Sequence, residues 1–135
     1  MPGKYPNENK VFLTGRLTYD PDLRYSASRQ VSVCDFTIAS ERNYQKDGAW
    51  KKNILYMQVA VWGKLAEEVS HRLKKGDAVF VEGRLQMRVW NPPSGAAQIK
   101  IFEIVCSKIA FLDEILKPTV ADESELPETE LLGGG

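Results

Sequence analysis

Reactive and metal-binding side chains are scarce in this chain. Its 135 residues include one histidine, His71, and two cysteines, Cys34 and Cys106. No cysteine and histidine spacing suits zinc, and neither a glycine-rich phosphate loop nor a nucleophile elbow occurs. Glu67 and Glu68 are adjacent in a helical pattern, so their side chains point about 100° apart and form no acid pair. The sequence therefore predicts a protein that is not an enzyme and needs no metal and no cofactor.

Long apolar runs are missing as well. No stretch reaches the ~18 consecutive apolar residues that a membrane-spanning helix requires. The N-terminal segment, MPGKYPNENK, lacks the apolar core of a secretory signal. Both cysteines fall in strand-like segments, which favours buried free thiols in a cytoplasmic protein, with a disulfide as the alternative.

Net charge is zero overall, but its distribution is uneven. Residues 1–112 hold 17 Lys and Arg against 11 Asp and Glu, whereas residues 113–135 hold one against seven. A basic body therefore precedes an acidic, proline-containing end, and that composition is typical of a disordered tail. We expect a flexible arm over residues 1–8, one domain over residues 9–112 and a disordered acidic tail over residues 113–135.

Alternation of apolar and polar residues predicts five strands, over residues 11–19, 31–40, 56–62, 78–90 and 98–112. Between the third and fourth strands, Leu65, Val69 and Leu73 recur at helical spacing, and Gly76 suits the end of that helix. Residues 22–30 are expected to cross from the first strand to the second. This order predicts an all-β protein with an OB-fold, a five-stranded Greek-key barrel with one short helix between strands 3 and 4. Such barrels bind oligonucleotides or oligosaccharides on the face of strands 2 and 3.

The fourth predicted strand separates two kinds of side chain. One phase of its alternation mixes aromatic rings with guanidinium groups, and the other is apolar and is expected to face the core. The expected core phase comprises Val79, Val81, Leu85, Met87 and Val89. The last predicted strand is apolar on both phases. Either a bulge shifts its register near Glu103, or its outer face meets another subunit.

Aromatic and basic side chains gather on the outward phases of the third and fourth predicted strands and in the polar segment of residues 41–53. Exposed rings beside cations indicate a partner with π-faces and negative charge, which a single strand of nucleic acid provides. The candidate stacking residues are Tyr44, Trp50, Tyr56, Trp62, Phe80 and Trp90. The candidate phosphate-contacting residues are Arg16, Lys46, Lys51, Lys52, Lys64, Lys74, Lys75, Arg84 and Arg88.

The polar segment of residues 41–53 contains Asp47-Gly48, a strong turn signal, so a hairpin is expected between the second and third strands. Rings and cations alternate along this segment, which suits a flexible clamp over a phosphate backbone. A solvated hairpin with Trp50 packed on its base is the alternative. For Phe80 the alternative is partial core packing.

Three motifs carry a family resemblance: NKVFLTGRLTYDPDLRY (residues 9–25), FTIAS (36–40) and VWGKLAEEVSHRLKKGDAVFVEGRLQMRVW (61–90). With the last strand they resemble the bacterial single-stranded DNA-binding protein family over the whole predicted domain. The resemblance implies a homotetrameric, nucleoid-associated OB-fold that wraps single-stranded DNA in replication, recombination and repair. It places family stacking positions on Tyr44, Tyr56, Trp62 and Trp90, and family phosphate contacts on Lys64, Lys74, Lys75 and Arg88.

The end of the chain departs from the family pattern. Family members usually close an acidic tail with Pro-Phe, which recruits replication and repair enzymes, whereas this chain ends in Leu-Leu-Gly-Gly-Gly. An OB-fold assembly module, as in primosome proteins, is the alternative function and would mainly bind other proteins. Binding of structured RNA is a third hypothesis and would use the same rings.

Overall fold

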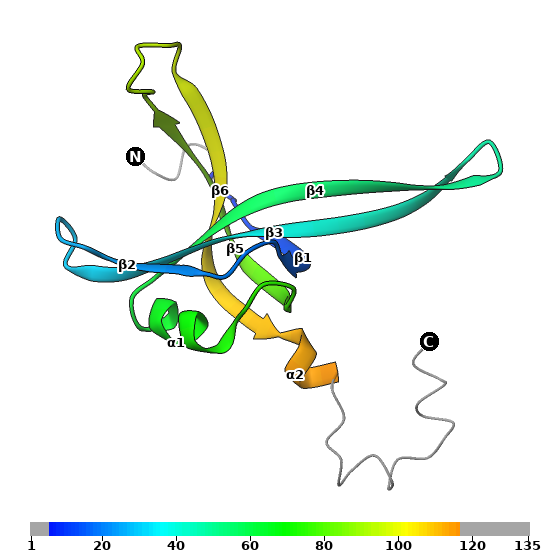
Figure 1. The fold of residues 1–135 in the computed structure, drawn as a ribbon, viewed down its shortest axis with the longest axis horizontal. Helices are drawn as coiled ribbons and strands as arrows, with labels where there is room; N and C mark the ends of the chain where they lie inside the picture. The colour runs from blue at the N-terminus through cyan, green and yellow to red at the C-terminus, as the bar shows by residue number, and fades with distance from the viewer. Residues whose placement is uncertain (1–5, 117–135) are drawn as a thin grey trace, which may run out of the picture.

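The computed structural model describes residues 6–116, with side chains described for residues 6–114. Its elements in chain order are β1 (Val11–Leu17), β2 (Asp22–Ser26), β3 (Val31–Lys46), β4 (Ala49–Trp62), α1 (Lys64–Arg72), β5 (Ala78–Trp90), β6 (Ile99–Phe111) and α2 (Leu112–Leu116). The strands pair in the order β1-β5-β6-β4-β3-β2, and a further pairing of β1 with β3 closes a five-stranded barrel (Figure 1). This is the predicted OB-fold, and the predicted helix lies between β4 and β5.

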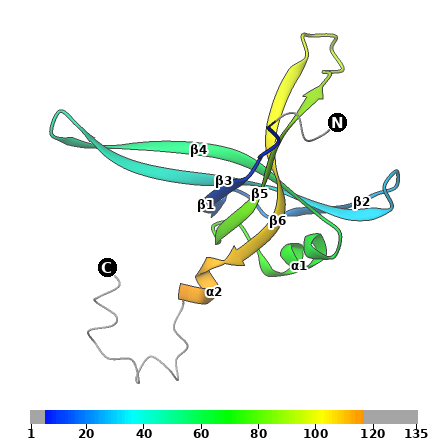
Figure 2. The ribbon, with the colours of Figure 1, turned by 180° about the vertical axis from the view of Figure 1, so that it is seen from behind.

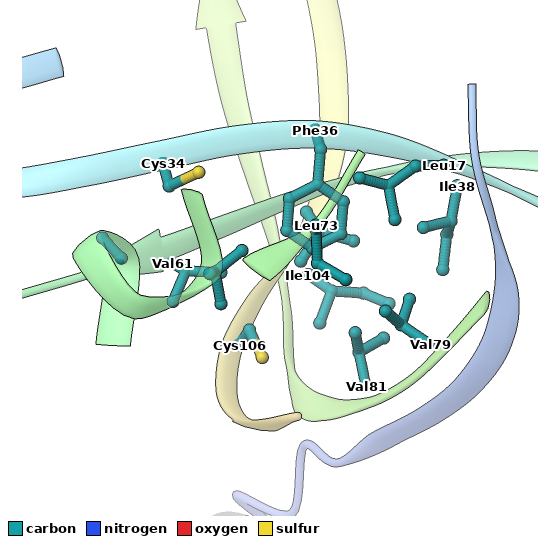
Figure 3. Close-up of a cluster of buried hydrophobic side chains, with 13 residues drawn as sticks. Leu17, Cys34, Phe36, Ile38, Val61, Leu73, Val79, Val81, Ile104 and Cys106 are labelled. Carbon is teal, nitrogen blue, oxygen red and sulfur yellow. The ribbon is translucent and has the colours of Figure 1, made fainter. Parts of the chain in front are cut away.

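The core fills the barrel with side chains from the inward phases of its strands and from one face of α1 (Figure 3). On α1, Val69 is fully buried and Leu73, just after the helix, is 4% exposed, as the helical spacing predicts. The largest fully buried side chains include Phe36, Ile38 and Ile104. Burying one such side chain contributes about 1.5–3 kcal/mol, so these residues dominate the stability of the fold.

Two hairpins project from the barrel in different directions. The β3–β4 arm (residues 40–55) runs to the right in Figure 1, and the β5–β6 arm (residues 84–104) runs upward. Figure 2 shows the same two arms from behind, with α1 and α2 near the other end of the barrel. The β3–β4 arm turns at Asp47 and Gly48, whose φ angles are 53° and 77°. Two successive positive φ values define the type I′ turn that Asp-Gly favours, so the predicted hairpin is confirmed.

Two expectations about local structure are wrong. Residues 41–53 form strands rather than a loop, because pairing of β3 with β4 continues without a shift from Val33–Trp62 to Lys46–Ala49. The right-handed twist of a type I′ turn matches that of the strands, so the turn supports pairing that the polar composition did not indicate. Residues 22–30 contain a sixth strand, β2, which pairs with β3 between Asp22–Asp35 and Ser26–Val31.

The predicted core phase of β5 is confirmed only in its first half. Val79 and Val81 are fully buried, but Leu85, Met87 and Val89 are 38%, 49% and 44% exposed. The expectation for these last three residues is wrong because β5 extends past the barrel into the β5–β6 arm. There its one strand partner among residues 6–116 is β6, and within that range no second layer of structure covers either face.

A bulge in β6 explains why this strand is apolar on both phases. Glu82 and Gly83 of β5 are adjacent, yet they pair with Lys108 and Cys106, so Ser107 is the extra residue. Ile104 and Cys106 are buried before the bulge, whereas Ile109 and Phe111 pack against the core after it. The expected bulge is therefore present, four residues beyond Glu103. An added Cβ at Gly83 would collide with the carbonyl oxygen of Val105, so this close crossing requires glycine.

The helix α2 occupies the first residues of the predicted acidic tail. The carboxylate of Asp113 accepts a hydrogen bond of 3.0 Å from the backbone N–H of Ala78, which ties α2 to the start of β5. The rest of the predicted tail, from residue 117, and most of the predicted N-terminal arm lie outside the described residues. Over residues 6–116, neither helix has the length and apolar character needed to cross a membrane.

Candidate nucleic-acid interface

The outward sides of β3, β4, β6 and β5 form one continuous surface, here called the outer face. Paired residues project to the same side of a sheet, so the register defines rows across it. One row runs Thr37, Gln58, Glu103 and Gln86, and the adjacent row contains Asp35 and Ala60. The outer face is therefore polar and charged across the middle of the sheet, opposite the apolar core.

Three of the predicted stacking rings share the outer phase of β4. Trp50, Tyr56 and Trp62 are evenly spaced along a strand whose pairing has no register shift. Trp50 is 71% exposed and Tyr56 is 63% exposed, so Trp50 does not pack on the base of the hairpin. Trp62, at the end of β4, is half-buried, and the guanidinium of Arg29 lies 4.8 Å from its ring centroid. The three rings therefore lie in one line along β4, from the β3–β4 arm to the barrel.

The remaining predicted rings lie elsewhere. Tyr44 pairs with Lys51, so it projects from the opposite face of the β3–β4 arm, where the Arg42 guanidinium lies 4.9 Å from its centroid. Trp90 ends β5 at the tip of the β5–β6 arm and is 45% exposed. Phe80 is half-buried and stacks on Phe12 of β1 with a centroid separation of 5.9 Å. Phe80 therefore belongs to a different patch from the rings of β4.

Several of the predicted cations have partners, including Lys52, which lies 3.6 Å from the Glu41 carboxylate. Arg88 contacts the carboxylate of Glu103 at 3.4 Å on the outer face. Arg16 instead donates to the carbonyl oxygen of Gly76 at 2.9 Å and lies 3.6 Å from the Asp113 carboxylate, which places it beside α2. Arg84 donates to the Gln86 side chain. Lys46, Lys51 and Lys52 are exposed near the tip of the β3–β4 arm, and Lys64, Lys74 and Lys75 are exposed at the two ends of α1.

Sequence reasoning missed two arginines beside the outer face. Arg29 covers Trp62, and Arg24 donates to the Asp35 carboxylate at 2.6 Å. Arg24 lies in β2 and Arg29 in the turn after it, within residues 22–30, which were expected only to connect two strands. The available signal was the alternation of Leu23 and Tyr25 with Arg24, which is short and lies next to a proline.

Neither cysteine offers a nucleophile. Cys34 and Cys106 are free and buried, so the predicted buried thiols are confirmed. Burial, with a smaller contribution from the Asp35 charge, raises the pKa of Cys34 to about 11. Burial likewise raises the pKa of Cys106 to about 11. Within the described part of the chain, no group of three His, Cys, Asp or Glu side chains could hold a metal ion.

Residues 8–112 match the model of the single-strand binding protein family. The chain belongs to this family. A family member from Chlorobaculum tepidum, single-stranded DNA-binding protein 2, is 34% identical over 126 residues, covering 93% of this chain and 84% of the relative. The single-stranded DNA-binding protein of Thermotoga maritima is 35% identical, covering 90% of this chain and 88% of the relative.

A solved structure supports the fold. The crystal structure of a small single-stranded DNA-binding protein from Streptomyces coelicolor superposes with a TM-score of 0.63 at 24% identity. The match covers 78% of this chain and 95% of that one. The family membership and this likeness agree with the OB-fold that the strand order defines.

Proposed function

We propose that this chain binds and protects single-stranded DNA without requiring a particular sequence. The observation that carries the proposal is the placement of Trp50, Tyr56 and Trp62 on one face of β4 in a member of the single-strand binding protein family. Every base has a π-face, so stacking on such rings tolerates any sequence and contributes about 1–3 kcal/mol per base. Lys52 on the same phase of β4 and Arg88 on β5 lie on the face of the rings and supply positive charge for phosphates.

The wider role follows from the family. We propose that the protein acts in replication, recombination and repair, is associated with the nucleoid in the cytoplasm, and assembles as a homotetramer. The exposed apolar side chains of the β5–β6 arm, such as Met87 and Phe102, support an assembly in which another copy covers them. Protein partners recruited through the acidic tail remain part of this proposal, as does the absence of enzymatic activity.

Quenching of tryptophan fluorescence by oligo-dT at low and high salt tests DNA binding directly. The three tryptophans of the chain are Trp50, Trp62 and Trp90, and stacked bases should quench them strongly. Added salt should weaken the affinity without abolishing the quench at saturation, because stacking persists when phosphate contacts are screened. A folded protein that shows no quench would contradict the proposal and favour the primosome-type assembly module.

Two exposed tyrosines provide a matched pair of variants. Tyr56 is 63% exposed on the outer phase of β4, and Tyr25 is 65% exposed on β2. Tyr25 pairs with Ser32, whose position in β3 is on the phase opposite the outer face. We expect Tyr56→Ala to weaken oligo-dT binding by about 1–3 kcal/mol, whereas Tyr25→Ala should leave it unchanged. Equal losses in both variants would show that exposure alone, and not the outer face, governs binding.

A further inference from the structure

A polar groove crosses the outer face beside Trp62. It has a volume of about 280 Å³. A smaller hollow of about 160 Å³ continues it toward Tyr19 and Gln58. Asp35, Arg88 and Glu103 line both spaces. The groove exists because Ala60, the smallest side chain of the outer phase of β4, lies opposite Asp35 between the larger Gln58 and Trp62.

Two carboxylates of the groove each keep one oxygen unpaired. Asp35 uses Oδ2 for both hydrogen bonds from Arg24, at 3.2 and 2.6 Å. Glu103 uses Oε1 for the contacts from Gln86 at 3.3 Å and Arg88 at 3.4 Å. Across residues 6–114, no buried side-chain oxygen lacks a partner. Asp35 Oδ1 and Glu103 Oε2 have no hydrogen-bond partner in that range, so neither atom is fully buried. Both oxygens are therefore accessible to an incoming donor.

The positions of both carboxylates are fixed by neighbouring arginines. Arg84 donates to the side-chain oxygen Oε1 of Gln86 at 2.9 Å, which turns the Gln86 side-chain nitrogen toward Glu103. The Glu103 side chain is only 8% exposed, so it is held in place rather than solvated freely. An acceptor held in this way has little orientational freedom to lose when it binds a donor. Phosphates offer no donors, so the free oxygens cannot recognise the backbone of a nucleic acid.

On the basis of the proposed single-strand function, we infer that this groove is a base-edge site. Asp35 and Glu103 accept hydrogen bonds from the exocyclic amino group of a base beside Trp62, and they favour cytosine over thymine. Carboxylates pair with the N4 amino group of cytosine, whereas thymine presents a carbonyl oxygen at the same position. The Gln86 amide nitrogen has a second N–H, which supplies a donor for the neighbouring ring nitrogen. The stacking surfaces bind any base, and this site adds a preference among them.

The test compares binding of fluorescein-labelled oligo-dC and oligo-dT of equal length, by anisotropy at one salt concentration, for the full chain and its variants. The readout is the ratio of the two affinities. Glu103→Gln should lower the dC to dT ratio about 2- to 10-fold, which corresponds to the net contribution of one hydrogen bond. The side-chain amide of glutamine can donate to the thymine carbonyl oxygen. Replacing one carboxylate oxygen by an NH2 group should therefore reduce the preference for cytosine.

Glu41→Gln is the matched control. It removes the same charge from the β3–β4 arm, where Glu41 lies 3.6 Å from Lys52 and outside the groove. Both affinities should rise together in this variant, with the ratio unchanged. If Glu103→Gln fails to fold by circular dichroism, Asp35→Asn provides the second test, because the Asp35 side chain is 32% exposed and less embedded.

Three outcomes distinguish the hypotheses. A ratio that falls in the groove variant but not in Glu41→Gln supports the base-edge site. A ratio that changes less than about twofold in the groove variant, while both oligonucleotides still bind, overturns the site and leaves the proposed function intact. Failure of the folded wild-type chain to bind either oligonucleotide overturns the proposed function and the base-edge site together.

Discussion

The barrel and its two arms are built from the same strands, but they differ in how far apolar side chains are buried. In β5, Val79 and Val81 inside the barrel are fully buried, while Leu85 and Met87 on the same phase of the arm are 38% and 49% exposed. Both pairs are apolar and lie on one phase of the strand. Alternation therefore identifies which side chains share a face, whereas burial depends on whether another layer covers that face.

The two arms also differ from each other. The outer phase of the β3–β4 arm carries exposed rings, and its tip carries lysines. The β5–β6 arm carries an apolar set that includes Leu85, Met87 and Phe102. Single-stranded DNA suits the first arm, and another protein surface suits the second. Buried apolar packing is thus concentrated in the barrel, and exposed apolar and aromatic side chains are frequent in the arms.

The largest expected effect separates the barrel from the β5–β6 arm. Ile104→Ala should lower the free energy of unfolding by about 2–5 kcal/mol, because it leaves a cavity in the core. Leu85→Ala should change it by less than about 0.5 kcal/mol in the isolated chain. Urea unfolding measures both. A large loss for Leu85→Ala that grows with protein concentration would show that another copy buries the arm.

Thiol chemistry gives the second contrast. The pKa of Cys34 is raised to about 11 from an ordinary value of 9.0, so below pH 9 its thiolate fraction is about 100-fold lower than that of an exposed thiol. Iodoacetamide at pH 8 should therefore alkylate the native barrel cysteines at least about 100-fold more slowly than an exposed cysteine introduced by Ser94→Cys in the β5–β6 connection. Comparable rates for all three thiols would show that the barrel opens readily.

The same thiols predict a dependence of stability on pH. A folded pKa of about 11 against an ordinary value of 9.0 means that the folded state holds its thiol protons more tightly than the unfolded state. This contribution is complete below pH 9 and is lost as the pH rises toward 11. The double variant Cys34→Ala, Cys106→Ala should therefore lose less stability than the wild type across that interval in urea unfolding.

The third contrast concerns charge on the arm and on the barrel. Arg88 of the arm lies on the outer face, whereas Lys108 of the barrel lies near Glu82 and its side chain is 78% exposed. Arg88→Gln should reduce the slope of log affinity against log salt by about 0.7, the value for one phosphate contact on a single strand. Lys108→Gln should leave the slope unchanged. The opposite pattern would place the DNA path over β6 and away from the arm.

The smallest expected effect lies at the tip of the β3–β4 arm. Gly48 has a φ of 77°, so Gly48→Ala strains the turn and should cost about 1 kcal/mol. Because the tip opens locally without unfolding the barrel, hydrogen exchange should rise in residues 43–52 and not in the core. Faster exchange throughout the barrel would show that the arm and the barrel unfold as one unit.

The sequence alone predicts the barrel better than the arms. Apolar alternation located the inward phases of β4 and of the first half of β5, helical spacing located α1, and Asp47-Gly48 located a hairpin. The strand character of residues 41–53 escaped prediction because pairing there depends on the turn and not on an apolar face. The β2 strand escaped because its five residues are largely exposed and carry no clear pattern.

The candidate site was predictable where it follows strand alternation. The shared phase of Tyr56 and Trp62 follows from alternation in the predicted third strand, whereas Trp50 was expected in a hairpin loop and joins that phase only because β4 extends to Ala49. The separation of Phe80 and Arg16 from that face does not, because it depends on how the barrel closes through β1. Asp35 and Glu103 also attracted no notice, since single carboxylates in strands acquire meaning only when the register brings them to one groove. The roles of all these residues in DNA binding remain predictions.

The extra residue at Ser107 has a consequence for the tolerance of this fold to changes in length. Before it, even-numbered side chains of β6 point inward, and after it, odd-numbered ones do. Deleting Ser107 would place Lys108 directly after Cys106, opposite Glu82 and Gly83, so the ladder would become regular while Ile109 and Phe111 still faced the core. Deleting one residue from the connection of residues 91–98 would change neither assignment. Single-residue gaps should therefore be tolerated both in that connection and at the bulge, even though the bulge lies inside a strand.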